Sequence, residues 1–274
     1  MDVTGENVGE PSRTMLLAID VGNTNIVLGV FDGARLAESW RLATLRERTS
    51  DELGILVTHL FARSGIAIDR VSGIILSSVV PPLTRTMEEM AERYFGRQPL
   101  TVDPETNTGM PVLYSPVSDV GADRVVNAVA AYEAYGRATR APVIVVDFGT
   151  ATTFDAISAA GEYIGGVICP GIGISADALF QRAARLPRVD VRKPPTVIGR
   201  TTVTSMQAGL FFGYVSMVDG IVARMRAELD GGDRAACIAT GGMADIIASE
   251  TIAIERVVPD LTLEGLRLIW ERNQ

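Results

Sequence analysis

The chain alternates short apolar runs, typical of strands, with segments whose apolar residues recur at helical spacing. In the first half this pattern predicts two strands joined by a tight turn, with Asp20 ending the first strand and Asp32-Gly33 closing the second. Thr49 and Glu52 have the spacing of a capping box and predict the start of a helix. The other strands and helices of this half are expected at 35–41, 53–61, 71–80, 83–95 and 100–102.

The second half predicts a similar order of elements. A helix from Ala122 to Tyr135 is expected before it, at the end of the first half, with Gly136 as its stop signal. Strands are then expected at 142–147, 152–158 and 162–169, and helices from Cys169-Pro170-Gly171 to Leu186, from Ser205 to Leu229 and from Leu261 to Arg272. Strands followed by helices in both halves indicate an α/β architecture.

Two segments share one detailed pattern: an apolar strand, Asp, one apolar residue, Gly, a short polar turn and a second strand. The corresponding residues are Asp20 and Asp147, Gly22 and Gly149, and Asn23 and Thr150. A pattern that occurs twice in one chain predicts a duplicated unit.

The chemistry of the first of these turns favours a bound anion. Gly22 lacks the Cβ that would keep an anion from the backbone, and it tolerates turn dihedrals that other residues avoid. Successive backbone N–H groups in such a turn can form an anion-binding nest. Asp20 is placed to hold a cation against that anion, which indicates a nucleotide phosphate with Mg²⁺. The alternative is an ordinary β-hairpin with Asn23 in its turn.

A third glycine turn, Gly241-Gly242, follows another apolar strand and precedes a helix. Together the three turns resemble the actin, sugar kinase and Hsp70 superfamily, in which two turns hold phosphates and the third lies by the adenosine. The resemblance implies an α/β fold of two related ribonuclease H-like lobes with the active site in the cleft between them. The lobes are expected at 15–140 and 141–274, with 1–14 a disordered extension and the closing helix able to pack back on the first lobe.

The segment from Gly121 to Arg124 opens the helix that precedes the second repeat. Asp123 and Arg124 occupy its first turn, where the helix dipole and the neighbouring guanidinium are both expected to favour an ionised Asp123. Such a carboxylate can accept a proton from an alcohol, and Arg124 can hold a substrate anion. A surface ion pair at a helix start is the alternative.

The string Gly171-x-Gly173-x-x-Ala176, with Asp190 downstream, imitates a dinucleotide-binding fingerprint. That fingerprint normally belongs to the first parallel βαβ unit, whereas the strand before Gly171 is third in an apparent meander. We therefore favour close backbone approach to a phosphate or a neighbouring subunit over a nicotinamide site.

Composition excludes several other kinds of site. The formal net charge of −8 disfavours a nucleic-acid-binding surface. Lys193 is the only lysine and no G-x-x-x-x-G-K-[ST] string occurs, which excludes a Walker-type phosphate loop. The basic run from Arg182 to Arg200 is expected to be a solvated face.

Cys169 and Cys237 are far apart in sequence and have no partner histidines, which favours reduced thiols in a cytoplasmic protein. The single histidine, His59, lies off the apolar stripe of its helix and is expected to be a surface residue.

Residues 1–14 lack the features of a signal peptide, so either Met1 or Met15 is the start. No uninterrupted apolar run is long enough to cross a bilayer.

Five segments in order make the resemblance specific: Asp20-Val-Gly-Asn-Thr-Asn25, Gly121-Ala-Asp-Arg124, Asp147-Phe-Gly-Thr-Ala-Thr-Thr153, Gly165-Gly-Val-Ile-Cys-Pro-Gly171 and Ser205-Met-Gln-Ala-Gly209. From Met15 onward the chain resembles the type III pantothenate kinases, bacterial enzymes of coenzyme A synthesis. The resemblance implies ATP-dependent phosphorylation of pantothenate to 4'-phosphopantothenate, Mg²⁺ and a K⁺ or NH₄⁺ ion, and a homodimer with pantothenate near the subunit interface.

The resemblance also assigns roles to residues. It makes Asp123 the general base, Asp20 a Mg²⁺ ligand and Asp147 the ligand of the monovalent cation. The residues it assigns to ATP are Asp20, Val21, Gly22, Asn23, Thr24, Asn25, Ile26, Val27 and Thr150. Those it assigns to pantothenate are Tyr114, Gly121, Ala122, Asp123, Arg124 and Thr202.

Two rival functions stay open on the sequence. A superfamily kinase acting on a sugar or acetate would share both phosphate turns, so only Tyr114 and the segment 121–124 discriminate against it. A non-catalytic regulator of the same fold is the second rival, against which the intact Asp20, Asp123 and Asp147 argue. Gly209, Gly213 and Gly220 along the long helix are consistent with a dimer interface.

Overall fold

The structure, a computed structural model, describes residues 14–274, so residues 1–13 of the expected extension lie outside the described residues. The chain divides into two compact units. The first, here called the N-terminal unit, ends at Thr106, and the second, the C-terminal unit, runs from Asn107 to Asn273. The lobe boundary expected at 140 follows the sequence repeat and differs from this division.

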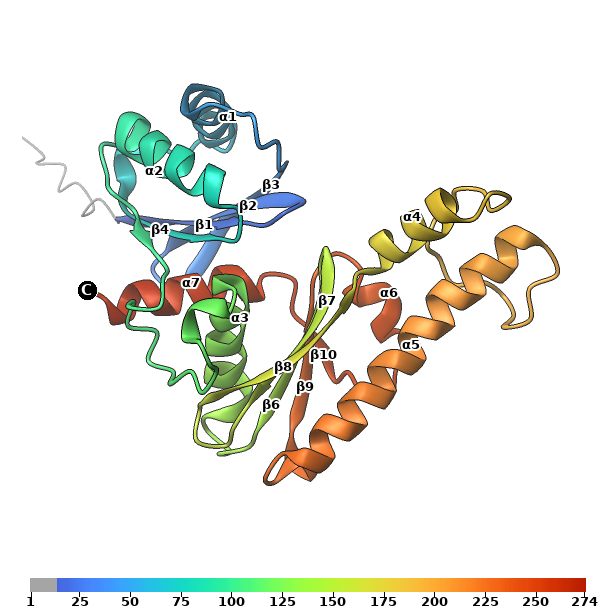
Figure 1. Cartoon of the computed structure of the whole chain (residues 1–274). Helices are drawn as coiled ribbons and strands as arrows, with labels where there is room; N and C mark the ends of the chain where they lie inside the picture. The colour runs from blue at the N-terminus through green and yellow to red at the C-terminus, as the bar shows by residue number, and fades with distance from the viewer. Residues whose placement is uncertain (1–13) are drawn as a thin grey trace, which may run out of the picture. The chain divides into compact units, whose positions relative to one another are not determined.

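The N-terminal unit is a five-stranded sheet with helices on one face (Figure 1). Its elements are β1 (Met15–Val21), β2 (Asn25–Asp32), β3 (Arg35–Ala43), α1 (Ser50–Arg63), a short turn of helix (Ile68–Arg70), β4 (Val71–Ser78), α2 (Pro81–Phe95) and β5 (Leu100–Thr101). The Thr49–Glu52 capping box expected at the start of α1 is present. Alternate residues of β1, such as Leu17 and Ile19, pack with α1 and α2, so Asp20 points to the opposite face.

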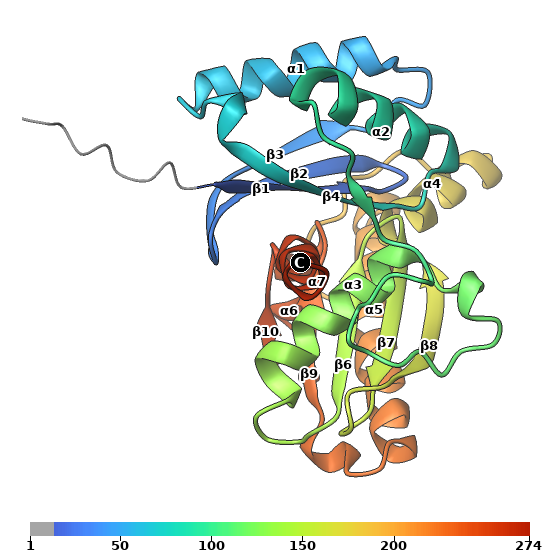
Figure 2. The same cartoon turned by 90° about the vertical axis from the view of Figure 1, so that its left-hand side faces the viewer.

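The C-terminal unit is also built on a five-stranded sheet, with helices on both faces (Figure 2). Its strands are β6 (Val143–Phe148), β7 (Ala151–Ile157), β8 (Tyr163–Pro170), β9 (Ala236–Thr240) and β10 (Arg256–Val257). Its α-helices are α3 (Ala122–Ala131), α4 (Ile172–Arg182), α5 (Thr202–Glu228), α6 (Ala244–Ala248) and α7 (Leu261–Arg272). Short helical turns occur at Val117–Asp119, Tyr132–Gly136 and Gly232–Arg234.

The two sheets have the same topology. The strand order is β3-β2-β1-β4-β5 in one and β8-β7-β6-β9-β10 in the other, with an antiparallel start followed by parallel pairs. Asp20 lies opposite Val27 and Asp147 opposite Thr153, at the same place in each hairpin. This equivalence confirms the duplicated unit.

Helix α3 packs against α7 and the sheet face that carries Asp147, whereas α5 and α6 cover the other face (Figures 1 and 2). A Cβ at Gly265 of α7 would clash with the Val126 carbonyl of α3, so the two helices cross at close range. This contact makes α3 and α7 part of the C-terminal unit and places the first turn of α3 beside the sheet.

Several elements differ from the expectations. Helix α4 ends at Arg182 rather than Leu186, and α5 begins at Thr202 because Thr201 and Thr204 form a capping box. The two-residue strand β10 was too short to show a periodic pattern. One described helix, α5, passes a test for membrane spans by length and mean hydropathy, although polar residues interrupt its apolar run. Half of its most apolar stretch is buried in the unit, as in a core helix.

Candidate active site

The first glycine turn joins β1 and β2 in the N-terminal unit and is tied to the end of β3. The Gly22 N–H donates to the Asn25 carbonyl at 2.9 Å, and the Thr44 hydroxyl donates to the Gly22 carbonyl at 2.7 Å. Asn23 and Thr24 are exposed at the tip of the turn, while Asp20 is half-buried at the end of β1. The structure therefore presents the turn to solvent on a fixed backbone.

The need for glycine at position 22 has a different cause from the one expected. Gly22 is not among the glycines with left-handed backbone dihedrals. A Cβ there would lie 3.1 Å from the Asn25 carbonyl oxygen, so the hairpin closes too tightly for a side chain without adjustment. The dihedral argument was wrong at this position, and close backbone approach replaces it.

Asp147, at the equivalent place in the C-terminal unit, is oriented by α3. Its Oδ2 accepts a hydrogen bond from the Asn127 side chain at 3.2 Å, and Asn127 accepts one from the Thr262 hydroxyl of α7 at 2.7 Å. A Cβ at Gly241 would lie 2.5 Å from Asp147 Oδ1. The third glycine turn therefore packs directly against this carboxylate and the Phe148 backbone, where no side chain would fit.

The second glycine turn holds Thr150 at the surface of the same unit. The Gly171 N–H donates to the Thr150 carbonyl at 3.1 Å, and a Cβ at Gly171 would clash with that oxygen. The glycine string at 171–176 thus serves close packing of the start of α4 on the turn at 149–150. Its glycine allows a close backbone approach within the unit, whereas the sequence favoured an approach to a phosphate or a neighbouring subunit.

Asp123 and Arg124 lie in the first turn of α3, as expected, but they do not form a surface pair. Arg124 is only 8% exposed, and its guanidinium faces Asp155 of β7, with Nε at 2.7 Å and Nη2 at 2.6 Å from Oδ1. Asp155 also accepts hydrogen bonds from the Tyr163 hydroxyl at 2.7 Å and the Thr153 hydroxyl at 3.2 Å. Arg124 is therefore engaged by a buried carboxylate.

The protonation of Asp123 differs from the expectation. Burial raises the pKa of the Asp123 carboxyl, and the negative charge of Asp155 raises it further, although the Arg124 N–H donates to Asp123 Oδ1 at 2.8 Å and opposes the rise. We expected the helix start and Arg124 to favour the ionised form. That expectation was wrong because the effect of burial outweighs both the backbone hydrogen bond and the positive charge of Arg124, which still lower the pKa of Asp123.

Tyr114 lies against the β8 edge of this site. A Cβ at Gly165, which has φ +140°, would lie 3.5 Å from the Tyr114 ring. At the next residue, Gly166, a Cβ would clash with the Phe154 carbonyl and lie 3.0 Å from Arg124 Nη2. Gly166 thus makes room for the Arg124 guanidinium, whereas a side chain at Gly165 is disfavoured by the backbone dihedral and not by Tyr114.

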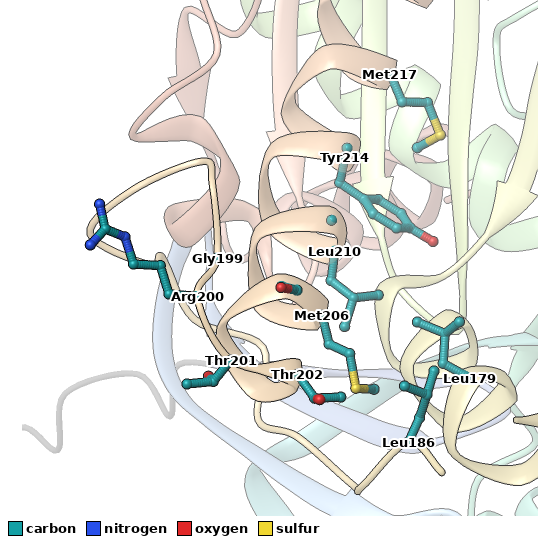
Figure 3. Close-up of a pocket in the computed structure, with 13 residues that line it drawn as sticks. Leu179, Leu186, Gly199, Arg200, Thr201, Thr202, Met206, Leu210, Tyr214 and Met217 are labelled. Carbon is teal, nitrogen blue, oxygen red and sulfur yellow. The ribbon is translucent and has the colours of Figure 1, made fainter. Parts of the chain in front are cut away.

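Thr202 lies elsewhere in the C-terminal unit. It is the first residue of α5, on the sheet face opposite α3, so one chain does not bring Thr202 and Asp123 together (Figure 1). It lines an open cavity of about 940 Å³ (Figure 3). The other lining residues include Leu179, Leu186, Met206, Leu210 and Met217.

The two carboxylates assigned to cations differ in their surroundings, and both suit the expected ion. Mg²⁺ keeps several waters and binds through one or two carboxylates plus substrate phosphates, so the single carboxylate of Asp20 beside an exposed turn suffices. Asp147 presents a half-buried carboxylate that the Asn127 side chain orients. Among residues 14–274 no group of three or more His, Cys, Asp and Glu side chains could form a metal site made of protein ligands alone.

Sequence reasoning missed four residues of the site: Thr44, Asn127, Asp155 and Tyr163. Asn127 carried a signal, since it lies four residues after Asp123 and therefore on the same helix face. Asp155 sits in an apolar strand, where a buried carboxylate requires a partner. The sequence alone did not identify that partner as Arg124.

The sequence of the chain matches the family described as Type III pantothenate kinase over residues 16–224. It is 60% identical over 259 residues to the Type III pantothenate kinase of Myxococcus xanthus (strain DK1622), covering 94% of this chain and 99% of that protein. It is 55% identical over 260 residues to the enzyme of the same description from Geobacter sulfurreducens, covering 95% of this chain and 100% of that protein.

Solved structures show the same fold at low identity. A Campylobacter jejuni protein described as a Baf family transcriptional activator matches with a TM-score of 0.58 at 17% identity, over 94% of this chain and 98% of that chain. MreB 5 of Spiroplasma citri bound to AMPPNP matches with a TM-score of 0.55 at 10% identity, over 96% and 98%. At these identities the likeness shows the fold alone.

Proposed function

The chain belongs to the type III pantothenate kinase family and catalyses the ATP-dependent phosphorylation of pantothenate in coenzyme A biosynthesis, and on this premise we propose that Asp123 is the general base. One observation carries the proposal: Asp123 is a half-buried carboxylate in the first turn of α3, with a raised pKa and beside a charge-compensated arginine. A general base works best when its pKa approaches the working pH.

In the proposed step the Asp123 carboxylate takes the proton of the primary hydroxyl of pantothenate. The hydroxyl oxygen forms a bond to the γ-phosphorus of ATP, and the bond from that phosphorus to the β,γ-bridging oxygen breaks, releasing ADP. Because such transfers need positioning and charge neutralisation more than covalent catalysis, one base and fixed phosphate contacts suffice. The backbone of 121–122 and the side chains of Tyr114 and Arg124 would orient pantothenate.

The glycine turns would hold ATP. Residues 20–27 of the first hairpin bind its phosphates, supported by the fixed backbone of Gly22 and by Thr44. Thr150 contributes from the second turn. Bound Mg²⁺ would neutralise phosphate charge, with Asp20 as its protein ligand.

Asp147 would hold the monovalent cation, K⁺ or NH₄⁺. The proposal is supported by the two hydrogen bonds that orient its carboxylate through Asn127 and Thr262. Since Asn127 and Asp123 share one face of α3, the cation would stabilise the helix that carries the base.

The active form is proposed to be a cytoplasmic homodimer in which Thr202 of one copy contacts pantothenate bound to the other. Support comes from apolar side chains exposed around α4 and α5, such as Ile168, Phe180 and Ile198, the last 81% exposed. A Cβ at Gly209 or Gly213 would meet nothing within 4 Å. This open apolar face suits a second copy of the chain.

Release of ADP with ATP, Mg²⁺ and K⁺ tests the proposal when pantothenate is compared with a panel of sugars and acetate. We expect turnover with pantothenate and only background release with the others. Turnover with a sugar or acetate would favour another superfamily kinase. Background release with every acceptor would favour a non-catalytic relative.

Sedimentation of the wild type and of Ile198→Asp tests the dimer separately. The wild type should sediment as a dimer of 29.2 kDa chains, and the variant should dissociate and lose affinity for pantothenate. A wild-type monomer with full activity would contradict this part of the proposal.

A further inference from the structure

The C-terminal unit contains a buried polar cluster that the reaction as described does not use. Asp155 is 0% exposed and accepts hydrogen bonds from three groups: the Arg124 guanidinium, the Tyr163 hydroxyl and the Thr153 hydroxyl. A buried carboxylate is costly unless it is paired and hydrogen-bonded, and here both conditions are met. Its one ionic partner, Arg124, is the residue next to Asp123.

The cluster fixes Arg124 from several sides. Both Nε and Nη2 lie within 2.7 Å of Asp155 Oδ1, and the guanidinium carbon lies 5.8 Å from the centre of the Tyr163 ring. Gly166 makes room for the guanidinium, since a Cβ there would lie 3.0 Å from Nη2. Contacts from β7 and β8 therefore hold the Arg124 guanidinium in a single position.

We propose that Asp155, supported by Tyr163, is a positioning residue that fixes the Arg124 guanidinium and cancels its charge beside Asp123. The inference rests on the proposed role of Asp123 and deepens it. An unpaired guanidinium would hold Asp123 ionised and make it a poor proton acceptor. The Asp155 carboxylate removes that influence, and it also sets the place where Arg124 meets the substrate.

The groups that act on Asp123 come from few elements. Arg124 lies on the same helix as Asp123, and Asp155 lies on β7. Tyr163 of β8 interacts with both Arg124 and Asp155, and Tyr114 interacts with Tyr163. Two other elements pack on α3: β6, whose Asp147 contacts Asn127, and α7, whose Glu264 and Arg267 pair with each other. Replacing Asp155 should therefore change the electrostatic surroundings of Asp123 more than a change at either of those elements.

Two variants separate charge from position. Asp155→Asn removes the charge and frees Arg124, so the acidic limb of the pH profile of kcat/KM should move to lower pH by about one unit. The KM for pantothenate should rise about tenfold or more because Arg124 loses its fixed place.

Tyr163→Phe keeps the charge of Asp155 but removes one hydrogen bond to it, so this variant should raise the KM for pantothenate and leave the acidic limb of the pH profile in place. Neither variant should change the KM for ATP by more than about twofold, since both act at the pantothenate end of the site.

Tyr132→Phe is the matched control. The Tyr132 hydroxyl donates to the Ala159 carbonyl at 2.9 Å in the same unit and does not contact the cluster. Its loss should leave both KM values and the pH profile at wild-type values. A purely structural role for tyrosine hydroxyls would instead change Tyr132→Phe and Tyr163→Phe alike, and that result would overturn the inference.

A measurement without turnover distinguishes the failure of this inference from failure of the proposed function. The Arg124 Nε–H, hydrogen-bonded to a buried carboxylate, should give a slowly exchanging signal in the ¹⁵N spectrum, assigned by its loss in Arg124→Lys. The signal should exchange faster in Tyr163→Phe, which keeps the test valid even where Asp155→Asn does not fold. An unprotected wild-type signal, or a wild-type pH profile in Asp155→Asn, would overturn the role of Asp155. Absent turnover of pantothenate by the wild type would instead count against the proposed function.

Discussion

Asp123 is a carboxylate whose surroundings disfavour its own charge. It is half-buried, and Arg124, the nearest cation, is paired with Asp155. Burial costs stability, but it also brings the pKa closer to the pH at which a proton acceptor is useful. At this residue function and stability therefore make opposite demands.

Replacing Asp123 by Asn should lower kcat by about 10²–10⁴-fold, the usual contribution of a positioned general base. The fold should persist because the amide is of similar size and its Oδ1 can still accept from the Arg124 N–H. Steady-state kinetics with pantothenate measure the effect. Asp69→Asn, an exposed acid in the first turn of another helix, should retain wild-type kcat.

The same substitution should raise stability at neutral pH. Because the pKa of Asp123 is raised on folding, the folded chain keeps a proton that the unfolded chain loses above about pH 3.9. The associated stability is complete below that pH and is lost as pH rises through the folded pKa. The melting temperature of Asp123→Asn should therefore exceed that of the wild type at pH 7, and the difference should shrink toward pH 4. A lower melting temperature for the variant at pH 7 would contradict this prediction.

The residues that could be predicted from sequence are those that end or begin an element. Asp20 and Asp147 follow apolar strands, and Asp123 lies at a helix start, so local pattern identified all three. Asp155 and Tyr163 lie inside strands, and their importance depends on the register of β7 with β8 and on the position of α3. Those long-range pairings are not encoded in any short window, so the buried pair could not be derived.

At the level of elements, the crossing of α3 and α7 fixes the position of the helix that carries Asp123. Gly265 allows the two helices to approach closely, since any Cβ there would clash with the Val126 backbone. Backbone atoms, unlike the end of a flexible side chain, cannot move aside. Gly265→Ala should therefore lower the free energy of unfolding by about 1–3 kcal/mol, as overpacking does. Denaturant unfolding measures the change, with a rise in the KM for pantothenate as α3 shifts.

Gly220→Ala is the control for this helix contact. Gly220 lies inside α5, and a Cβ there meets only the flexible end of Arg224, at 3.2 Å. Alanine should be neutral or stabilise the helix by about 0.5–1 kcal/mol. Equal decreases in the free energy of unfolding in both variants would mean that the close α3–α7 contact does not make position 265 especially sensitive to a side chain.

The first hairpin gives a second prediction for an element. Thr44→Val removes the hydrogen bond from the Thr44 hydroxyl to the Gly22 carbonyl and loosens the turn assigned to ATP phosphates. The KM for ATP should rise several-fold, on the scale of one neutral hydrogen bond of about 1 kcal/mol, with the KM for pantothenate unchanged. Thr86→Val, which removes an exposed hydroxyl bonded to the Pro82 carbonyl, should change neither value.

At the scale of the whole molecule, the duplicated topology was predictable because the same sequence pattern occurs at the first hairpin of each sheet. The boundary of the compact units was not, because α3 precedes the second repeat in sequence but packs with α7 near the end of the chain. Such a contact joins residues that no local pattern relates. The repeat thus identifies the two sheets, while packing decides which helices belong to each.

In the proposed function the equivalent carboxylates of the two sheets have different roles, with Asp20 assigned to Mg²⁺ and Asp147 to a monovalent ion. Replacing K⁺ by Na⁺ at constant ionic strength should suppress turnover, because the smaller ion does not match a site formed for K⁺. Asp147→Asn should be slow in both salts. Equal wild-type rates in K⁺ and Na⁺ would contradict the assignment of Asp147.

The most direct test of the account is the position of pantothenate itself. A crystal structure with pantothenate and a non-hydrolysable ATP analogue measures the distance from the Asp123 carboxylate to the primary hydroxyl oxygen. The account predicts a hydrogen bond of about 2.6–3.2 Å between these groups. A complex in which that hydroxyl contacts another acid or base, with Asp123 facing away from it, would contradict the account.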